Sequence, residues 1–297
     1  MNHNKSTKRK HRYIDYDYEN YYDIPFNQQE DLDIKKLLDK NLIGVQYCSK
    51  TIQSGNQFEI EIYPLFSKKE MDKFKPSKKP TRLAQKSLND RNARKHFIRL
   101  INNNFNQDDY VMHLTYSNEN RPPTIELAEK EVYKFIRKIN YRRKKLGLKN
   151  AKWIYVTEYD PTKKIKVHHH LIIEKGLDRK VMKDLWKLGK RIRVDELEPD
   201  EDGLTGLATY LSKDPKGKKR WKGSKWLKKP IERKSYTVFS KKKIKNMISN
   251  EMLVSQYLNA NYKSKKYVKH EIRYNKVNRM YYIYARMINK VNERRTI

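Results

Sequence analysis

The stretch Val167-His168-His169-His170-Leu171-Ile172-Ile173 decides how this sequence folds, because it sets three histidines inside an apolar, β-branched run. Side chains of a β-strand alternate between two faces. The odd-numbered positions of this stretch form an apolar face that includes His169. His168 and His170 project together from the opposite face. The sequence therefore predicts a half-buried strand that presents two imidazoles side by side.

Two neutral imidazoles on a rigid strand supply half of a divalent-metal site. Such a site needs a further ligand, preferably an anionic one, and Glu158 on the preceding strand is the first candidate. If the turn centres near Lys163, Glu158 lies directly across from His168 on the same face. Asp160 is the alternative ligand. The competing interpretation is that the histidines are structural or simply lie at the surface.

The elements around the histidine strand follow the order β-α-β-β-α-β. Strands are expected at residues 110–116, 152–159, 164–174 and 191–197, with helices at 124–147 and 178–188. This order is that of split βαβ, ferredoxin-like domains. We expect an α+β fold with a ferredoxin-like or RRM-like antiparallel sheet, helices on one face and the other face open to a ligand.

The remaining sequence predicts four regions. Residues 1–40 are polar and expected to be largely disordered, with a short helix near 32–38. Residues 41–79 hold a hairpin and a basic, proline-containing linker. Residues 80–235 contain the histidine strand and form the principal domain, and residues 236–297 form a basic C-terminal helix and hairpin.

The charge balance points to a polyanionic partner. The chain has 69 Lys and Arg against 35 Asp and Glu, a net charge of +34, which favours nucleic acid over a membrane surface. Between residues 216 and 245 there are 14 Lys and Arg against one acidic residue, Glu232. Aromatic residues in a cationic run are typical of single-strand binding. The candidate DNA-binding residues are Arg220, Trp221, Lys222, Lys225 and Trp226; the alternative is that both tryptophans pack in the core.

Several classes of protein are disfavoured. No apolar run approaches the length of a spanning helix, and the N-terminus lacks the apolar core of a signal peptide, so we expect a cytoplasmic protein without a membrane partner. Cys48 is the only cysteine, which excludes an intrachain disulfide framework and a Cys-rich zinc site. The acidic residues between 195 and 202 fit no calcium-loop spacing, and a solvated turn is favoured there.

One further pattern carries chemistry, Tyr210-Leu211-Ser212-Lys213. On a helix, positions i and i+3 share a face, so Tyr210 and Lys213 can reach one target together. The pattern Tyr-x-x-Lys also occurs at Tyr47, Tyr141 and Tyr262. Only Tyr210 begins a short helix after the fourth strand of the histidine-bearing unit. Chain order therefore selects this tyrosine.

Taken together, these motifs resemble the HUH endonuclease superfamily, and more narrowly the rolling-circle replication initiators related to the filamentous-phage gene II protein. The first motif matches Met112-His113-Leu114-Thr115-Tyr116. The second matches His168-His169-His170 with its acidic partner Glu158, and the third matches Tyr210 and Lys213. The resemblance covers about residues 80–235.

The resemblance implies a metal-dependent nickase and ligase. Mg²⁺ or Mn²⁺ would be held by Glu158, His168 and His170, and imidazole ligands suit Mn²⁺ better than Mg²⁺. Tyr210, assisted by Lys213, would attack a phosphodiester and form a 5′-phosphotyrosine link. The implied partners are single-stranded or hairpin DNA at the replication origin of a plasmid, phage or integrative element, and the replication machinery of a bacterial host.

Two departures from the family pattern and three alternatives remain. The middle residue of the histidine motif is usually apolar, whereas here it is His169, and only one tyrosine stands in position where relatives can have two. A relaxase or single-tyrosine transposase would share this site. A non-catalytic single-strand binder would need only the positive charge. A metal-dependent hydrolase using water would not need Tyr210.

Overall fold

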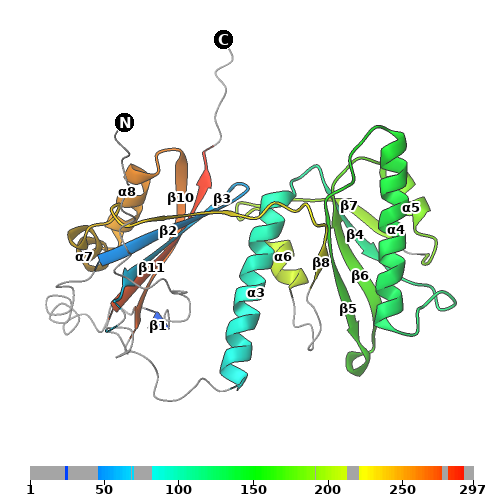
Figure 1. Cartoon of the computed structure of the whole chain (residues 1–297), viewed down its shortest axis with the longest axis horizontal. Coiled ribbons are helices and arrows are strands. Elements are labelled where there is room, and N and C mark those ends of the chain that lie inside the picture. Colours follow the sequence, from blue (N-terminus) through cyan, green and yellow to red (C-terminus); the bar gives the residue numbers. More distant parts are fainter. Residues whose placement is uncertain are drawn as a thin grey trace, which may run out of the picture. The chain divides into compact units, whose positions relative to one another are not determined.

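The computed structural model describes residues 24–25, 46–67, 69, 82–190, 192–212, 221–275 and 280–290. Two compact units divide the chain, and each is described by itself (Figure 1). Unit 2 comprises Asn89–Pro230 with Ser54–Asn56, and unit 1 comprises the sequence on either side of it. The predicted histidine domain at 80–235 spans unit 2 with short extensions.

Unit 2 is built on a five-stranded sheet in which every pairing is antiparallel. The strands, in spatial order, are β7 (Arg193–Glu196), β4 (Tyr110–Leu114), β6 (Ile165–Ile173), β5 (Trp153–Asp160) and β8 (Lys222–Gly223). Helix α4 (Ile125–Lys145) connects β4 to β5, and α5 (Arg179–Leu185) connects β6 to β7. The expected α+β class and element order are therefore observed. The short β8 is an additional edge strand.

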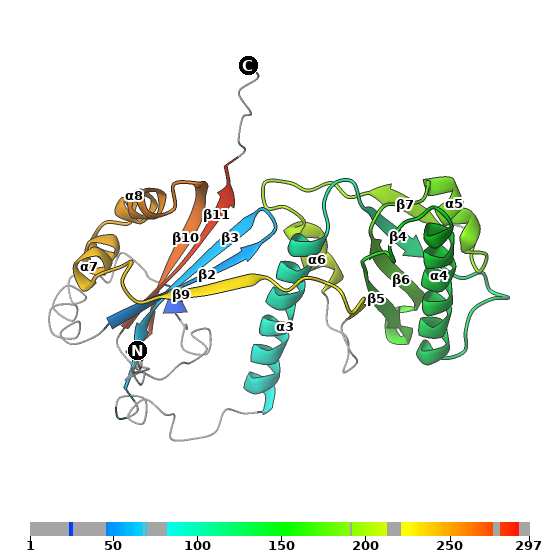
Figure 2. The same cartoon turned by 45° about the horizontal axis from the view of Figure 1, so that its top comes forward.

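Helices α4 and α5 cover one face of this sheet, as both views show (Figures 1 and 2). Helix α4 begins after Thr124, whose side-chain oxygen accepts a hydrogen bond from the backbone N–H of Leu127. Its buried stripe recurs at helical spacing and packs on the inner residues of β4, β5 and β6. The members of that stripe are Ala128, Val132, Phe135, Ile136 and Ile139. The sequence predicted this stripe correctly.

Helices also pack on the opposite face, which corrects the expectation of helices on one face only. Helix α3 (Arg82–Asn104) and helix α6 (Thr205–Leu211) form a second core with the sheet. The physical reason is that Ile154 and Ile172, which lie on the same face as His168 and His170, are apolar and fully buried. Burying them requires a second layer. That layer packs at the end of the strands that carries these isoleucines.

Unit 1 contains a six-stranded sheet in the order β1-β10-β11-β3-β2-β9. Its strands are β1 (Ile24–Pro25), β2 (Gln46–Ser54), β3 (Gln57–Leu65), β9 (Ile231–Ser235), β10 (Lys265–Asn275) and β11 (Met280–Asn289). Helices α7 (Lys241–Ser249) and α8 (Met252–Asn261) join its core (Figure 2). The hairpins predicted near each end of the chain are both observed. They meet through β3 and β11, where Ile62 pairs with Ile283.

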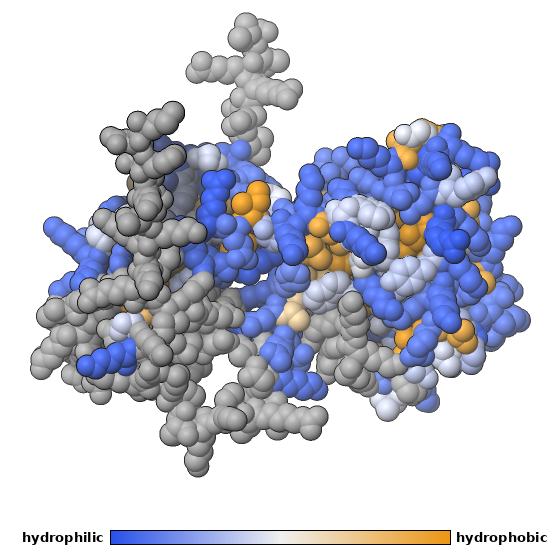
Figure 3. Space-filling view, in the orientation of Figure 1, coloured by the Kyte–Doolittle hydropathy of each residue, from blue (hydrophilic) through white to orange (hydrophobic). Residues whose placement is uncertain are grey.

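Some expectations concern residues outside those the structure describes. Of the segment 1–40, only Ile24–Pro25 is described, as the edge strand paired with β10; the helix near 32–38 and most of the linker at 68–80 lie outside, as do Lys213 and Arg220. No helix among the described residues has the length and apolar character needed to cross a membrane. Hydrophilic side chains cover most of the described surface, with hydrophobic ones in separate patches (Figure 3).

Candidate functional site

The turn between β5 and β6 fixes which residues of these two strands face each other. A short 3₁₀ helix, Pro161–Lys163, connects them. The carboxylate of Asp160 accepts hydrogen bonds from the backbone N–H and the hydroxyl of Thr162, at 3.1 and 2.6 Å. Lys164 follows with φ of 56°, and an irregularity between Glu158 and Asp160 adjusts the register. Glu158 consequently pairs with His168, as the sequence predicted. Asp160, the alternative ligand, is used in the turn.

His169 points into the core beneath α4 and is fully buried. Its Nε2 lies 2.9 Å from the Tyr116 hydroxyl, and its Nδ1 lies 2.9 Å from the Thr157 hydroxyl. Because Tyr116 donates its proton to the carbonyl of Ala128, it accepts from Nε2–H, and Thr157 donates to Nδ1. Burial, followed by the charges of the two neighbouring histidines, lowers the pKa of His169 to about 3. His169 is thus a neutral, fully hydrogen-bonded core residue.

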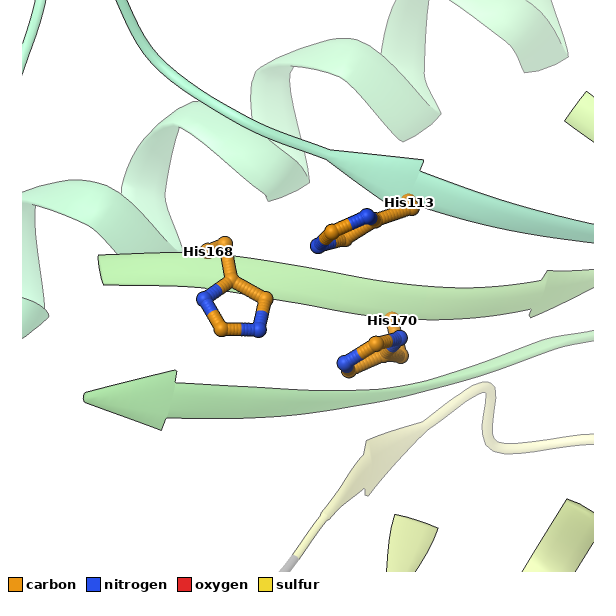
Figure 4. A group of neighbouring side chains, drawn as sticks. All are labelled: His113, His168 and His170. Atoms are coloured by element: carbon orange, nitrogen blue, oxygen red, sulfur yellow. The ribbon is translucent and has the colours of Figure 1, made fainter. Parts of the chain in front are cut away.

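His168 and His170 lie on the opposite face, where the structure adds a third imidazole from β4. His113 pairs in register with His170, and their rings stack with centroids 4.8 Å apart and planes 2° apart. The ring of His168 meets both edge-on. One nitrogen from each of the three rings lies within 4.8 Å of the others (Figure 4). Among the described residues this is the group of side chains that could hold a metal ion.

The nitrogens of these rings have the properties of metal ligands. Burial, followed by the charge of His168, lowers the pKa of His113 and brings that of His170 to about 4, so both rings are neutral near pH 7. Their Nε2 atoms are buried, and no described group hydrogen-bonds to them. His168 donates from Nδ1 to the carbonyl of Lys166 at 2.8 Å, which leaves the Nε2 lone pair free. A backbone carbonyl that fixes the tautomer in this way is typical of metal-binding histidines.

Glu158 supplies a carboxylate beside the imidazoles. Its Oε2 lies 3.4 Å from Nε2 of His168 and 3.5 Å from Nε2 of His170. Both distances exceed a good hydrogen bond. One carboxylate oxygen therefore lies close to two nitrogens that have lone pairs to share. Three imidazoles and one carboxylate form a donor set that fits a divalent transition-metal ion.

Tyr210 lies at the edge of this cluster. Helix α6 packs into the second core through Ala208 and Leu211, which are buried, and this leaves Tyr210 facing outward with 53% of its surface exposed. Its ring meets that of His170 edge-on, with centroids 5.9 Å apart. The hydroxyl-bearing side chain is therefore accessible and adjacent to the histidines. The structure brings together four of the five sequence-predicted catalytic and metal residues; the fifth, Lys213, lies outside the described residues.

Arg193 joins the same row of the sheet. It pairs with His113 across β7 and β4, just as His113 pairs with His170 across β4 and β6. Directly paired residues share a face, so a guanidinium extends the row of imidazoles. Its side chain is 77% exposed, 3.6 Å from Asp195, and its charge contributes to the lowered pKa of His113.

Sequence reasoning missed both His113 and Arg193 as site residues. His113 stands in the strand motif quoted above, at a position whose neighbours Met112 and Leu114 are apolar, and this alternation marked it as lying on the polar face. Nothing in the sequence marked Arg193, because its place depends on which strand pairs with β4.

The predicted DNA-binding residues around β8 have mixed surroundings. Trp221 packs against Phe97 of α3 with ring centroids 4.8 Å apart. Trp226 is 46% exposed and donates from its indole nitrogen to the carbonyl of Ala151. Lys222 pairs with Glu129 at 2.6 Å. Lys225 is exposed. Their role in binding DNA stays a prediction.

The acidic stretch that follows β7 forms a turn. The Asp200 carboxylate accepts a hydrogen bond from the backbone N–H of Asp202, and Gly203, with φ of 67°, pairs with Asp200 through two backbone hydrogen bonds. Glycine suits this left-handed conformation because it lacks a Cβ. The geometry agrees with the solvated turn that the sequence favoured.

Comparison with known proteins gives one positive finding. No curated protein and no solved structure matches the chain. The segment 109–215, which runs from the start of β4 to just beyond α6, matches the model of a replication-associated protein family, that of ORF2 and the gene II protein. This match covers the strands that carry the three histidines and the helix that carries Tyr210, and it assigns the segment a replication-associated role.

Proposed function

We propose that this protein initiates rolling-circle replication by nicking and rejoining single-stranded DNA through Tyr210. The observation that carries the proposal is the packing of an exposed tyrosine against His170, at the edge of a cluster of imidazoles whose buried nitrogens have no protein partner among the described residues. A carboxylate and an arginine lie on the same face. The family match over 109–215 supports the same role.

The fold supports this proposal as well. Numbered in chain order, the strands β4, β5, β6 and β7 have the spatial order fourth, first, third, second. That order, with helices after the first and third strands, is the ferredoxin-like arrangement expected of the HUH superfamily from its resemblance to this sequence. The functional residues would then be presented by the two central strands.

His113, His168, His170 and Glu158 would hold the divalent cation. The fit rests on the two unpartnered Nε2 atoms and on the tautomer that the Lys166 carbonyl imposes on His168. Mn²⁺ suits a site with three imidazoles better than Mg²⁺, which prefers oxygen ligands. When bound, such a cation supplies Lewis acidity to a phosphate oxygen.

Tyr210 would act as the nucleophile. Its oxygen forms a bond to phosphorus while the bond from phosphorus to the 3′ oxygen breaks, leaving a 5′-phosphotyrosine and a free 3′-OH. The phenol loses a proton and the leaving oxygen gains one, so the step is balanced. Because one phosphoester replaces another, the reverse attack by a 3′-OH rejoins the strand without an external energy source.

Arg193 would bind the phosphodiester. A guanidinium donates paired hydrogen bonds to phosphate oxygens in a fixed geometry. Arg193 lies next to His113 in the row that leads to His170, and its exposure leaves it accessible to DNA. This residue would hold the strand while Tyr210 attacks.

The experiment is capture of a covalent adduct. A single-stranded pool of random sequence, labelled at its 3′ end, is incubated with the full-length protein and Mn²⁺ and separated under denaturing conditions. We expect labelled protein, no labelled protein with EDTA, and no adduct from Tyr210→Phe although this variant still binds DNA. Sequencing the captured strands would give the preferred site.

The matched control is Tyr141→Phe, which alters another exposed tyrosine of a Tyr-x-x-Lys pattern. It should form the adduct at the normal rate. Normal cleavage by Tyr210→Phe would contradict the nucleophile assignment and favour a hydrolase that uses water. Tight binding without cleavage in Mn²⁺ would favour the non-catalytic single-strand binder.

A further inference from the structure

A basic groove runs between α4 and α5 on the face of the sheet opposite to the histidine cluster. Its volume is about 850 Å³, and five cationic side chains and one carboxylate, Asp184, line it. Lys134 pairs with Glu131 at 2.6 Å. The other four cations form no ion pair with any residue that the structure describes: Arg137, Lys138, Arg142 and Lys187.

These unpaired charges are arranged along a line. The basic residues of α4 at the groove recur every three or four positions, so they lie on one side of the helix. From residue 134 to 142 the helix rises about 12 Å, which corresponds to roughly three nucleotides at about 3.4 Å each along one strand. Lys187 adds a cation from beyond α5. The spacing fits a polyanion with regularly repeated charges.

An aromatic side chain lies among these cations. Tyr141 is 59% exposed, and the ammonium group of Lys145 lies 4.8 Å from the centre of its ring. Cations interleaved with an exposed aromatic ring are the pattern of sequence-tolerant single-strand binding, in which bases stack on the ring. An acidic peptide helix would instead need a broad apolar strip to bind against. The apolar groups here are few, with Val181 exposed and Leu185 partly buried.

We infer that the groove between α4 and α5 is a second nucleic-acid site, which binds the backbone of single-stranded DNA away from the histidine cluster. The site reads no sequence, because phosphate contacts carry no sequence information. It would hold a part of the strand that is not being cleaved. The inference does not depend on catalysis at Tyr210.

The test uses the full-length protein and a fluorescein-labelled oligothymidylate, with binding followed by anisotropy at several salt concentrations. The variant Lys138→Gln/Lys187→Gln removes two groove charges, and Lys241→Gln/Lys242→Gln removes two exposed charges from α7 as a matched control. Loss of two phosphate contacts should make the slope of log affinity against log salt about 1.4 less steep. The control pair should change it less.

A second variant addresses stacking. Tyr141→Leu should weaken oligothymidylate binding about fivefold or more, whereas Tyr141→Phe, which keeps the ring, should not. All altered side chains are exposed, and circular dichroism verifies that each variant is folded. Equal slopes for the groove and control pairs would overturn the inference. So would loss of poly-glutamate binding by the groove pair with unchanged DNA binding, which would assign the groove to an acidic protein.

Discussion

The two faces of β6 treat neighbouring histidines in opposite ways. On the inner face, both nitrogens of His169 have hydrogen-bond partners. On the outer face, the Nε2 atoms of His113 and His170 are buried without one among the described residues. A buried polar atom that lacks a partner costs about 1–3 kcal/mol. The comparison teaches that function is marked by unsatisfied nitrogens, whereas histidine content alone would not distinguish the two faces.

The largest effect should come from removing an outer imidazole. His170→Ala is expected to lower the rate of adduct formation on the order of 10³-fold, because a metal ligand and the ring beside Tyr210 are both lost. Mn²⁺ affinity, measured by calorimetry, should fall in parallel. His270→Ala in unit 1 is the matched control. An unchanged Mn²⁺ affinity in His170→Ala would remove the metal assignment.

Arg193 extends the outer row, and its loss should have a smaller effect. Arg193→Ala is expected to slow adduct formation about 10- to 100-fold, the value of one charged hydrogen bond to phosphate, and Arg193→Lys should restore part of the rate. Arg179→Ala, which alters an arginine paired with Glu196, should leave the rate unchanged. Equal rates for Arg193→Ala and the wild type would show that the outer row ends at His113.

The inner face should respond in stability instead of activity. His169→Leu is expected to lower the free energy of unfolding by about 1–3 kcal/mol, because the Thr157 hydroxyl loses its acceptor. Adduct formation should persist. All four tryptophans lie in unit 2, so urea unfolding followed by tryptophan fluorescence reports on this unit alone. If His169→Leu/Thr157→Val does not recover part of the loss, the hydrogen bond is not the cause.

Acid should produce the smallest change per step. The pKa of His169 is about 3 in the folded protein against 6.5 for a free side chain, so the unfolded chain binds a proton first as pH falls. Its contribution to stability is complete above pH 6.5 and is lost between pH 6.5 and about 3, by at most about 1.4 kcal/mol per pH unit. Urea unfolding at several pH values in EDTA measures this slope, and His169→Leu should reduce it. An identical slope in both proteins would contradict the neutral assignment.

The sequence sufficed for features that depend on local spacing. Alternation along β6 separated His169 from His168 and His170, and the turn chemistry at Asp160 gave the pairing of Glu158 with His168. The buried stripe of α4 followed from helical periodicity. Each of these relations spans fewer than a dozen residues, a distance over which backbone geometry determines which side chains meet.

Relations between distant strands could not be predicted in this way. His113 joins the site because β4 pairs with β6, more than fifty residues later, and Arg193 because β7 pairs with β4. Alternation gives a residue's face, but the neighbour of a strand is decided by the packing of the whole sheet. The second helical layer was missed for the same reason, because Ile154 and Ile172 reveal a buried patch without revealing that α3 and α6 cover it.

The pairing of β3 with β11 has a consequence for synthesis on the ribosome. Ile62 meets Ile283, a partner made more than two hundred residues later, whereas the segment Asn89–Pro230 is nearly continuous. During translation the histidine-bearing unit can therefore complete its fold while the first hairpin still waits with an open edge. Chains that terminate early would expose that edge to one another, so aggregation of truncated products is the characteristic hazard of this architecture.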